Sequence, residues 1–278
     1  MRKMIGSLAC LCALFAGCAR ASPPTEHVAG VAPLGKDVFA AVDTDQFDAG
    51  TFTAPDGTTL SYRLLRPSQL KEGGKYPLVV QFHGSGGIGT DNARQLDRLA
   101  RSWAMPDLRE RYQAYILVPQ FPIRSANYGP ASPDQKSEAS PALATAMELV
   151  REFSATHPVD PARIYATGFS MGGSAAWLAP TLAPALFAAI VPLSGIAPAD
   201  THATAFKDLP VLVFHGNADD ENPITADKRF FAAIQNEDGH SIRFREYEGL
   251  AHQPPADIYP GIAWRDWLFQ QRLQEKPE

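Results

Sequence analysis

The chain has 278 residues, of which 45% are hydrophobic, and a formal net charge of −5 at neutral pH. This length is enough for one large domain or two small ones with a substantial apolar core. No cluster of basic residues could neutralise a row of phosphates, so nucleic acid is excluded as an expected partner.

The first residues have the pattern of an export signal. A short basic start is followed by an apolar run that is too short to span a bilayer and ends in small residues. We therefore expect residues 1–17 to be a signal peptide and the protein to be exported. The segment Phe15-Ala-Gly-Cys18 resembles a bacterial lipobox, which implies that Cys18 is lipidated and anchors the protein in the cell envelope, periplasmic or on the outer surface. The alternative is ordinary cleavage near Ala19 or Ala21, which would leave a secreted protein without a lipid.

The three cysteines stand at positions 10, 12 and 18, so no disulfide is expected in the body of the chain. Residues 18–46 begin with a stretch rich in Ala, Pro and Gly, which is typical of a flexible tether. Residues 47–278 are predicted to form one folded domain. The membrane would be reached through the N-terminal lipid only, and no obligate protein partner is evident.

From Phe47 onward, predicted strands alternate with predicted helices. Residues 50–53 and 59–65 flank Asp56-Gly57, a turn signal typical of a β-hairpin. Further strands are predicted over residues 77–82, 114–118, 164–166, 188–193, 211–214 and 242–247, and helices over 142–153, 226–234 and 261–273. The last helix is expected to turn Ile262, Trp264, Trp267 and Leu268 inward. This order predicts an α/β fold with a mostly parallel sheet covered by helices on both faces.

The most informative segment follows the short strand at 164–166. Gly168-Phe-Ser-Met-Gly172 has the pattern G-x-S-x-G, and the residues after it favour a helix. A strand, a sharp turn and a helix in this order form the context of a nucleophile elbow, in which the serine has a strained backbone and the glycines leave room for close neighbours. The helix N-terminus behind the serine favours developing negative charge. Ser170 is therefore our first candidate for a catalytic residue.

A reactive serine needs a base, a carboxylate that orients the base, and N–H donors for the oxyanion. Asp219 lies just beyond the strand at 211–214, and His252 lies just beyond the strand at 242–247. The carboxyl ends of parallel strands meet at one edge of a sheet, so these side chains are expected to lie together. The chain order Ser170, Asp219, His252 is also the order of an α/β-hydrolase triad.

Other residues could fill two of these roles. Asp220 is the alternative acid and Glu248 a more distant one, since loop aspartates often cap helices. His240 is the alternative base, but it does not follow a strand directly. His215 is expected to support the acid loop by packing and hydrogen bonding rather than to react.

The oxyanion donors are predicted beside the serine. The strand at 77–82 ends in His83-Gly-Ser-Gly-Gly87, a turn that can bring backbone N–H groups to the site. We assign one donor to the N–H of Ser85, with Gly86 as the alternative, and the other to the N–H of Met171. The turn lacks the Gly-Lys-Ser/Thr of a phosphate-binding loop, and no His or carboxylate pair has the spacing of a zinc site. We therefore expect no metal and no cofactor.

Taken together, four motifs resemble those of the α/β-hydrolase superfamily. They are His83-Gly-Ser-Gly-Gly87, Gly168-Phe-Ser-Met-Gly-Gly173, His215-Gly-Asn-Ala-Asp219 and Gly249-Leu-Ala-His252. The likeness covers roughly residues 51–268. It is closest to exported single-domain esterases: feruloyl and acetyl-xylan esterases, polyhydroxybutyrate-depolymerase-like enzymes and phospholipase/carboxylesterase relatives. The catalytic domain of prolyl oligopeptidases is also similar.

This resemblance implies a serine esterase with a Ser170–His252–Asp219 triad. Residues 119–128 follow the family only loosely, and they should line the acyl or alcohol pocket. Substrate contacts are expected from His83, Gly86, Phe169 and Tyr128. The short segment 193–209 leaves little or no room for a lid, which favours bulky or polysaccharide-linked esters over buried long acyl chains. The expected partner is a small-molecule or polymer-linked ester substrate. The alternatives are a serine peptidase and, from a different class, a lipid-anchored binding protein without activity.

Overall fold

The computed structural model describes residues 25–31, 36–39, 42–239 and 241–273. The predicted signal peptide and Cys18 lie outside these residues. Within the described residues, no helix has both the length and the apolar composition needed to cross a membrane.

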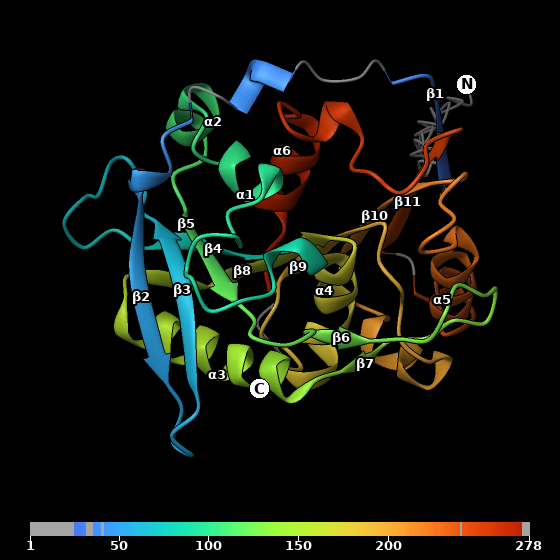
Figure 1. The fold of residues 1–278 in the computed structure, drawn as a ribbon, viewed down its shortest axis with the longest axis horizontal. Coiled ribbons are helices and arrows are strands. Elements are labelled where there is room, and N and C mark those ends of the chain that lie inside the picture. Colours follow the sequence, from blue (N-terminus) through green and yellow to red (C-terminus); the bar gives the residue numbers. More distant parts are fainter. Residues whose placement is uncertain (1–24, 32–35, 40–41, 240, 274–278) are drawn as a thin grey trace, which may run out of the picture.

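A nine-stranded sheet forms the centre of the molecule, with β1 and β11 at one end and β2 and β3 at the other (Figure 1). The strand order is β1-β11-β10-β9-β8-β4-β5-β3-β2, and only the β2–β3 and β3–β5 pairs are antiparallel. The strands are β1 (Thr25–Ala29), β2 (Phe47–Thr53), β3 (Thr59–Leu65), β4 (Tyr76–Phe82), β5 (Tyr115–Gln120), β8 (Val159–Phe169), β9 (Ala189–Leu193), β10 (Val211–Gly216) and β11 (Ile242–Glu248). A separate small ribbon pairs β6 (Ala126–Asn127) with β7 (Glu138–Ala139). The predicted mostly parallel sheet is confirmed.

Helices cover both faces of this sheet. They are α1 (Arg98–Ser102), α2 (Pro106–Arg111), α3 (Pro141–Thr156), α4 (Met171–Leu182), α5 (Ile224–Asn236) and α6 (Ala263–Gln270). The helices α3, α4 and α5 pack into one apolar cluster, and α1, α2 and α6 pack into the other (Figure 1). Successive residues of β4 point to opposite clusters: Leu78 and Val80 join the first and Val79 the second. This alternation explains why the central strands are continuous apolar runs, since both their faces are buried.

The last helix is shorter than predicted, and one of its residues is placed wrongly by the sequence. Trp264 and Leu268 are buried as expected, and the partly buried Trp267 packs against the same cluster. Ile262 is 48% exposed because it precedes the helix. Two residues correspond to about 200° around a helix, so Ile262 and Trp264 cannot share a face.

The described part of residues 18–46 corrects the prediction of a flexible tether. Thr25–Ala29 forms β1, which pairs in parallel with β11 along the edge of the sheet. Glu26 forms an ion pair with Arg245 at 3.2 Å, and the buried ring of Phe39 meets Tyr259 edge-on at 5.1 Å. An edge strand is held mainly by backbone hydrogen bonds and needs no apolar alternation, so composition gave no signal for it.

Candidate active site

Ser170 occupies a strained turn between β8 and α4. Its φ of 58° and ψ of −121° lie in a region that residues with a side chain rarely adopt. The N–H of Ser170 donates to the carbonyl of Leu193 at 2.9 Å, which ties the turn to β9. A Cβ added to Gly168 would lie 2.5 Å from the carbonyl oxygen of Gly172, and one added to Gly172 would overlap the carbonyl of Phe82. The two glycines therefore permit the close packing that fixes the turn.

The structure brings Ser170, His252 and Asp219 into one hydrogen-bonded line. The Nε2 of His252 lies 2.8 Å from the Oγ of Ser170, and its Nδ1 lies 2.8 Å from Oδ2 of Asp219. Three loops supply them, those after β8, β10 and β11, which all leave the same edge of the sheet. With Nδ1–H donating to the carboxylate, Nε2 is the free acceptor for the serine hydroxyl.

The alternative acids and base are placed differently. Asp220 and Glu248 are exposed, and neither contacts His252 within the described residues. His240 lies outside the described residues. Another acid, Glu221, has Oε2 3.8 Å from Nε2 of His252, but its side chain is 72% exposed.

The carboxylate of Asp219 is fully buried and well supplied with donors. Its Oδ1 accepts the backbone N–H groups of Asn222 at 2.8 Å and of Glu221 at 3.1 Å. Burial by itself would raise the pKa of Asp219, but hydrogen bonds from His215, His252 and Asn222 hold that pKa well below its usual value. Asp219 is therefore ionised throughout the neutral range.

A second histidine, His215, lies beneath Asp219 and is also fully buried. Its Nε2 is 2.8 Å from the carbonyl oxygen of Asn222 and 3.4 Å from Oδ2 of Asp219. Its Nδ1 is 2.9 Å from Oδ2 of Asp227, whose Oδ1 accepts the indole N–H of Trp177 at 2.9 Å. Burial lowers the pKa of His215, but hydrogen bonds with Asp219 and Asp227 outweigh it and raise the pKa to about 9. Both ring nitrogens thus face acceptors, and the ring is a buried cation at neutral pH.

The sequence predicted support from His215 but missed Asp227 and Trp177. One signal could have pointed to Asp227. It stands on α5 three residues after Ile224 and four before Phe231, both apolar, so it shares their buried face. An acid at such a position requires a buried partner.

The structure corrects the prediction that His83 contacts substrate, whereas the predicted contact from Gly86 stays a prediction. His83 is fully buried; its Nε2 accepts the N–H of Phe121 at 3.0 Å, and its Nδ1–H donates to the carbonyl of Gly84 at 2.7 Å. Burial lowers the pKa of His83 to about 4, so the ring is neutral and both nitrogens are used. His83 instead ties the glycine turn to the end of β5. Gly86 is exposed and does not line the cavity over Ser170.

Phe169 and the two residues predicted to donate to the oxyanion, Ser85 and Met171, lie beside the triad. Phe169 is half-buried, and its ring lies 4.9 Å from the imidazole of His252. Gly84 passes close to Ser170, since a Cβ added to it would lie 3.9 Å from the Cβ of Ser170. This approach brings the turn with Ser85 beside the serine. Met171 is the first residue of α4, so its N–H has no acceptor within the helix.

A cavity of about 540 Å³ opens over Ser170. It is lined by Ser85, Ser170, Glu221, Asn222 and residues of the loop that joins β5 to α3, including the predicted Tyr128. The same loop contributes Arg124, which the sequence did not single out, and its guanidinium lies 4.6 Å from the centre of the Tyr128 ring. The segment that departs from the family pattern, 119–128, thus contributes Arg124 and Tyr128 to the cavity wall, and the rest of the loop contributes residues between 129 and 135.

The segment between β9 and β10 does not cover this cavity. It contains one short helical turn over Asp200–Phe206. The buried ring of Phe206 packs against Trp177 at 5.8 Å and against Phe230 at 5.1 Å. The turn therefore packs down onto α4 and α5, in agreement with the predicted lack of a substantial lid.

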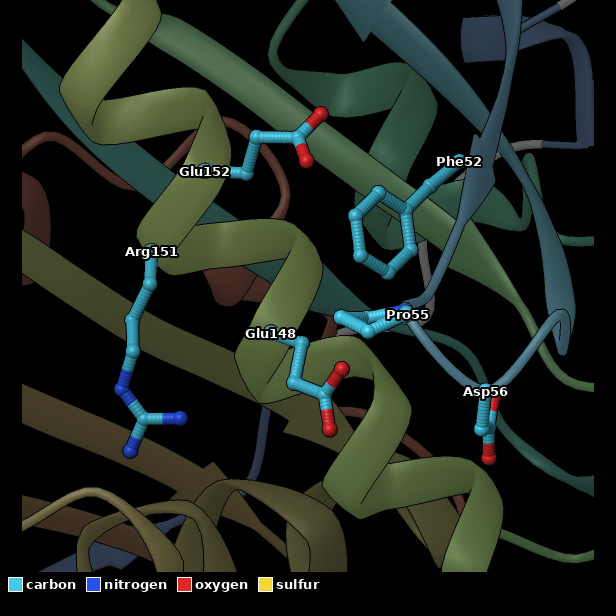
Figure 2. Close-up of a pocket in the computed structure, with 6 residues that line it drawn as sticks. All are labelled: Phe52, Pro55, Asp56, Glu148, Arg151 and Glu152. Atoms are coloured by element: carbon cyan, nitrogen blue, oxygen red, sulfur yellow. The ribbon is translucent and has the colours of Figure 1, made fainter.

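A second hollow of about 450 Å³ lies between the turn after β2 and the helix α3 (Figure 2). Its lining consists of Phe52, Pro55, Asp56, Glu148, Arg151 and Glu152. None of these residues belongs to the candidate triad or to the cavity over Ser170. Among the residues that the structure describes, no group of three or more His, Cys, Asp or Glu side chains is arranged so that it could hold a metal ion.

Comparison with known proteins agrees with this geometry. The model of the phospholipase/carboxylesterase family matches residues 121–258, which include Ser170, Asp219 and His252. A protein named as an esterase, NocK of Nocardia uniformis subsp. tsuyamanensis, is 30% identical over 222 residues, 75% of this chain and 61% of NocK. The crystal structure of a thermostable esterase is 32% identical, with a TM-score of 0.73 over 82% of this chain and 64% of that chain.

Peptidases share the same fold. The acylaminoacyl peptidase of Pyrococcus horikoshii is 17% identical, with a TM-score of 0.58, covering 87% of this chain and 44% of the peptidase. This chain spans less than two thirds of the length of both NocK and the thermostable esterase. The fold, the turn at Ser170 and these relatives lead to one conclusion: the chain belongs to the α/β-hydrolase superfamily.

Proposed function

We propose that the protein is a serine hydrolase that cleaves carboxylic esters through an acyl-enzyme. The observation that carries the proposal is the line of two 2.8 Å hydrogen bonds from Asp219 through His252 to Ser170, ending at an open cavity. A carboxylate, an imidazole and a hydroxyl in this order can deliver an alkoxide-like nucleophile to a bound carbonyl. The two esterase relatives support the choice of ester chemistry.

In the first half-reaction, the Oγ of Ser170 attacks the ester carbonyl while Nε2 of His252 takes its proton. Asp219 keeps Nδ1 of His252 protonated and stabilises the imidazolium that forms. The N–H groups of Ser85 and Met171 stabilise the oxyanion, with the positive end of α4 adding to the field. His252 then protonates the leaving alcohol as the carbon–oxygen bond breaks, which leaves the acyl group on Ser170.

In the second half-reaction, His252 takes a proton from water, and the hydroxide attacks the acyl carbonyl. The same N–H groups stabilise the second oxyanion. Collapse of this intermediate breaks the bond to Ser170, whose oxygen regains a proton from His252. The products are an acid and an alcohol.

The open, lid-poor cavity favours bulky esters or esters attached to a polymer over buried long acyl chains. The N-terminal pattern, outside the described residues, favours an exported protein held in the cell envelope by a lipid on Cys18. Expression of the full chain with a labelled fatty acid tests the anchor. The wild type should be labelled and Cys18→Ala should not, whereas equal labelling would rule out Cys18 as the anchor.

A matched ester and amide test the chemistry. We expect purified protein to hydrolyse 4-nitrophenyl acetate much faster than 4-nitroacetanilide, and Ser170→Ala to lose most of this turnover while keeping its thermal unfolding midpoint. Comparable or faster turnover of the amide would indicate that the protein is a serine peptidase instead. A folded Ser170→Ala with wild-type turnover would end the proposed mechanism.

A further inference from the structure

We propose that Arg124 forms a subsite for a carboxylate carried by the ester substrate, so that the enzyme prefers anionic esters. This inference rests on the proposed ester hydrolysis and names the substrate class of the same site. Three observations support it: the position of Arg124, the contacts that hold its side chain, and the charges around it.

Arg124 lines the same cavity as Ser170. Its Nε donates to the carbonyl of Ala126 at 3.2 Å, and its guanidinium carbon Cζ lies over the ring of Tyr128, 4.6 Å from the ring centre. These two contacts hold the stem and one face of the guanidinium, while no acceptor among the described residues takes the terminal Nη groups. A guanidinium fixed in this way is prepared to bind a carboxylate through two parallel hydrogen bonds.

Several other arginines of the described chain are paired with carboxylates, and others, such as Arg63 and Arg265, donate from their terminal nitrogens to backbone carbonyls. Arg66 pairs with Asp48 at 2.6 Å, Arg111 with Asp266 at 2.8 Å and Arg163 with Asp160 at 2.6 Å. Arg124 has no such ion pair within the described residues. An arginine that lacks a counter-ion and lies in a cavity beside a reactive serine is suited to a charge that arrives with the substrate.

The charges of the cavity also give the substrate a direction. Glu221 lines the cavity as well, and its Oε2 lies 3.8 Å from Nε2 of His252. A substrate carboxylate is attracted to Arg124 and repelled by Glu221, so it should point toward the β5–α3 loop and away from the catalytic imidazole. The neutral ester group is then left at Ser170.

Two pairs of chromogenic esters test the subsite and show which half of the substrate carries the charge. In the acyl pair, 4-nitrophenyl hemiglutarate is compared with 4-nitrophenyl pentanoate. In the alcohol pair, 4-acetoxybenzoate is compared with its methyl ester. We expect wild-type kcat/KM to favour the anionic member of at least one pair.

Arg124→Gln should then lower kcat/KM for the preferred anionic ester about 10–100-fold, the range for a hydrogen bond to a charged group, and change that for the neutral partner less than about threefold. Arg124→Lys should lose less, since it keeps the charge but not the paired donors. Glu221→Gln should raise kcat/KM for the anionic ester. The matched control is Arg151→Gln, an equal loss of charge at an exposed site in the second hollow (Figure 2), which should leave the anionic-to-neutral ratio unchanged.

Two results would overturn the subsite while leaving ester hydrolysis intact. One is a wild type that treats both members of each pair alike. The other is an Arg124→Gln variant, with a wild-type unfolding midpoint, that slows anionic and neutral esters equally. Failure of the wild type to hydrolyse any of the four esters, or hydrolysis that Ser170→Ala leaves unchanged, would instead overturn the proposed function itself.

Discussion

Below the candidate triad, the acid Asp219 contacts a buried histidine, His215, which is itself paired with Asp227. The imidazole of His215 bridges the two carboxylates, at 3.4 Å from Oδ2 of Asp219 and 2.9 Å from Oδ2 of Asp227. The protonated ring thus lies between two fully buried carboxyl groups; burial raises the pKa of Asp227, while its hydrogen bonds with His215 and Trp177 act in the opposite direction. Such a group is costly to disturb, because removing one charge leaves the others buried without a partner.

The pH dependence of stability should report the proton on His215. Its pKa is about 9 in the folded protein against 6.5 for an ordinary histidine, so the folded state binds this proton more tightly than the unfolded state. The resulting stabilisation is fully present below about pH 6.5 and is lost as the pH rises through about 9. Urea unfolding between pH 6 and pH 10 should show this loss in the wild type.

His215→Asn provides the comparison for that measurement. It should lower the free energy of unfolding near pH 7 by about 3–5 kcal/mol, because Asp227 is left buried without its cation. It should also remove the fall in stability between pH 6.5 and pH 9. A variant that keeps the wild-type pH slope would show that His215 carries no extra proton.

The choice between neighbouring acids is testable by amide substitution. Asp219→Asn should lower kcat about 10³–10⁴-fold, because an amide in that place favours the wrong tautomer of His252. Asp220→Asn is the matched control, since that side chain is exposed and makes no contact with His252 in the described structure, and it should change kcat less than about twofold. Steady-state hydrolysis of an aryl ester measures both. A larger loss with Asp220→Asn would reverse the assignment.

Among the helices and strands, the sequence predicted those whose formation depends on residues that are close together in the chain. The elbow was predictable because close packing around Ser170 requires glycine at Gly168 and Gly172. The central strands were predictable because burial on both faces produces continuous apolar runs. Asp219 and His252 were predictable as residues just beyond strand ends, since a parallel sheet gathers these at one edge.

Two of the missed elements, β1 and the ribbon of β6 and β7, depend on partners that are distant in the chain or on very short strands. β1 exists because β11 offers it an edge, and the ribbon of β6 and β7 has only two residues in each strand. The role of His83 was missed for a similar reason: the N–H of Phe121, which donates to its Nε2, is brought to it by the tertiary approach of two loops, while its Nδ1–H donates to the carbonyl of the neighbouring Gly84. No local pattern distinguishes a histidine satisfied in this way from one that faces a substrate.

The contribution of β1 can be measured by removing residues 1–30. This deletion exposes the edge of β11, the strand that leads to His252, and removes the ion pair between Glu26 and Arg245. We expect a loss of a few kcal/mol in the free energy of unfolding and a tendency to aggregate through the bare edge. Thermal unfolding and light scattering would show both. An unchanged midpoint would mean that β1 adds nothing to the stability of the domain.

For the molecule as a whole, the central sheet is the scaffold that places the candidate catalytic residues together at one of its edges. Both faces are covered by helices, so the carboxyl ends of β8, β10 and β11 are where polar side chains can meet a ligand. The loop between β5 and α3, rather than a lid after β9, gives this edge much of its cavity wall. Under the proposed function, the β5–α3 loop would select the ligand and the loops after β8, β10 and β11 would cleave the bond, so substrate preference could vary without a change in the catalytic residues.

Labelling with a fluorophosphonate, followed by mass spectrometry of the intact chain and of its peptides, would identify the reactive side chain. We expect one adduct per chain, located on Ser170, absent from Ser170→Ala and formed much more slowly by His252→Ala. A folded protein that takes up no label, or that carries the label on another residue, would contradict the assignment of Ser170 as the nucleophile.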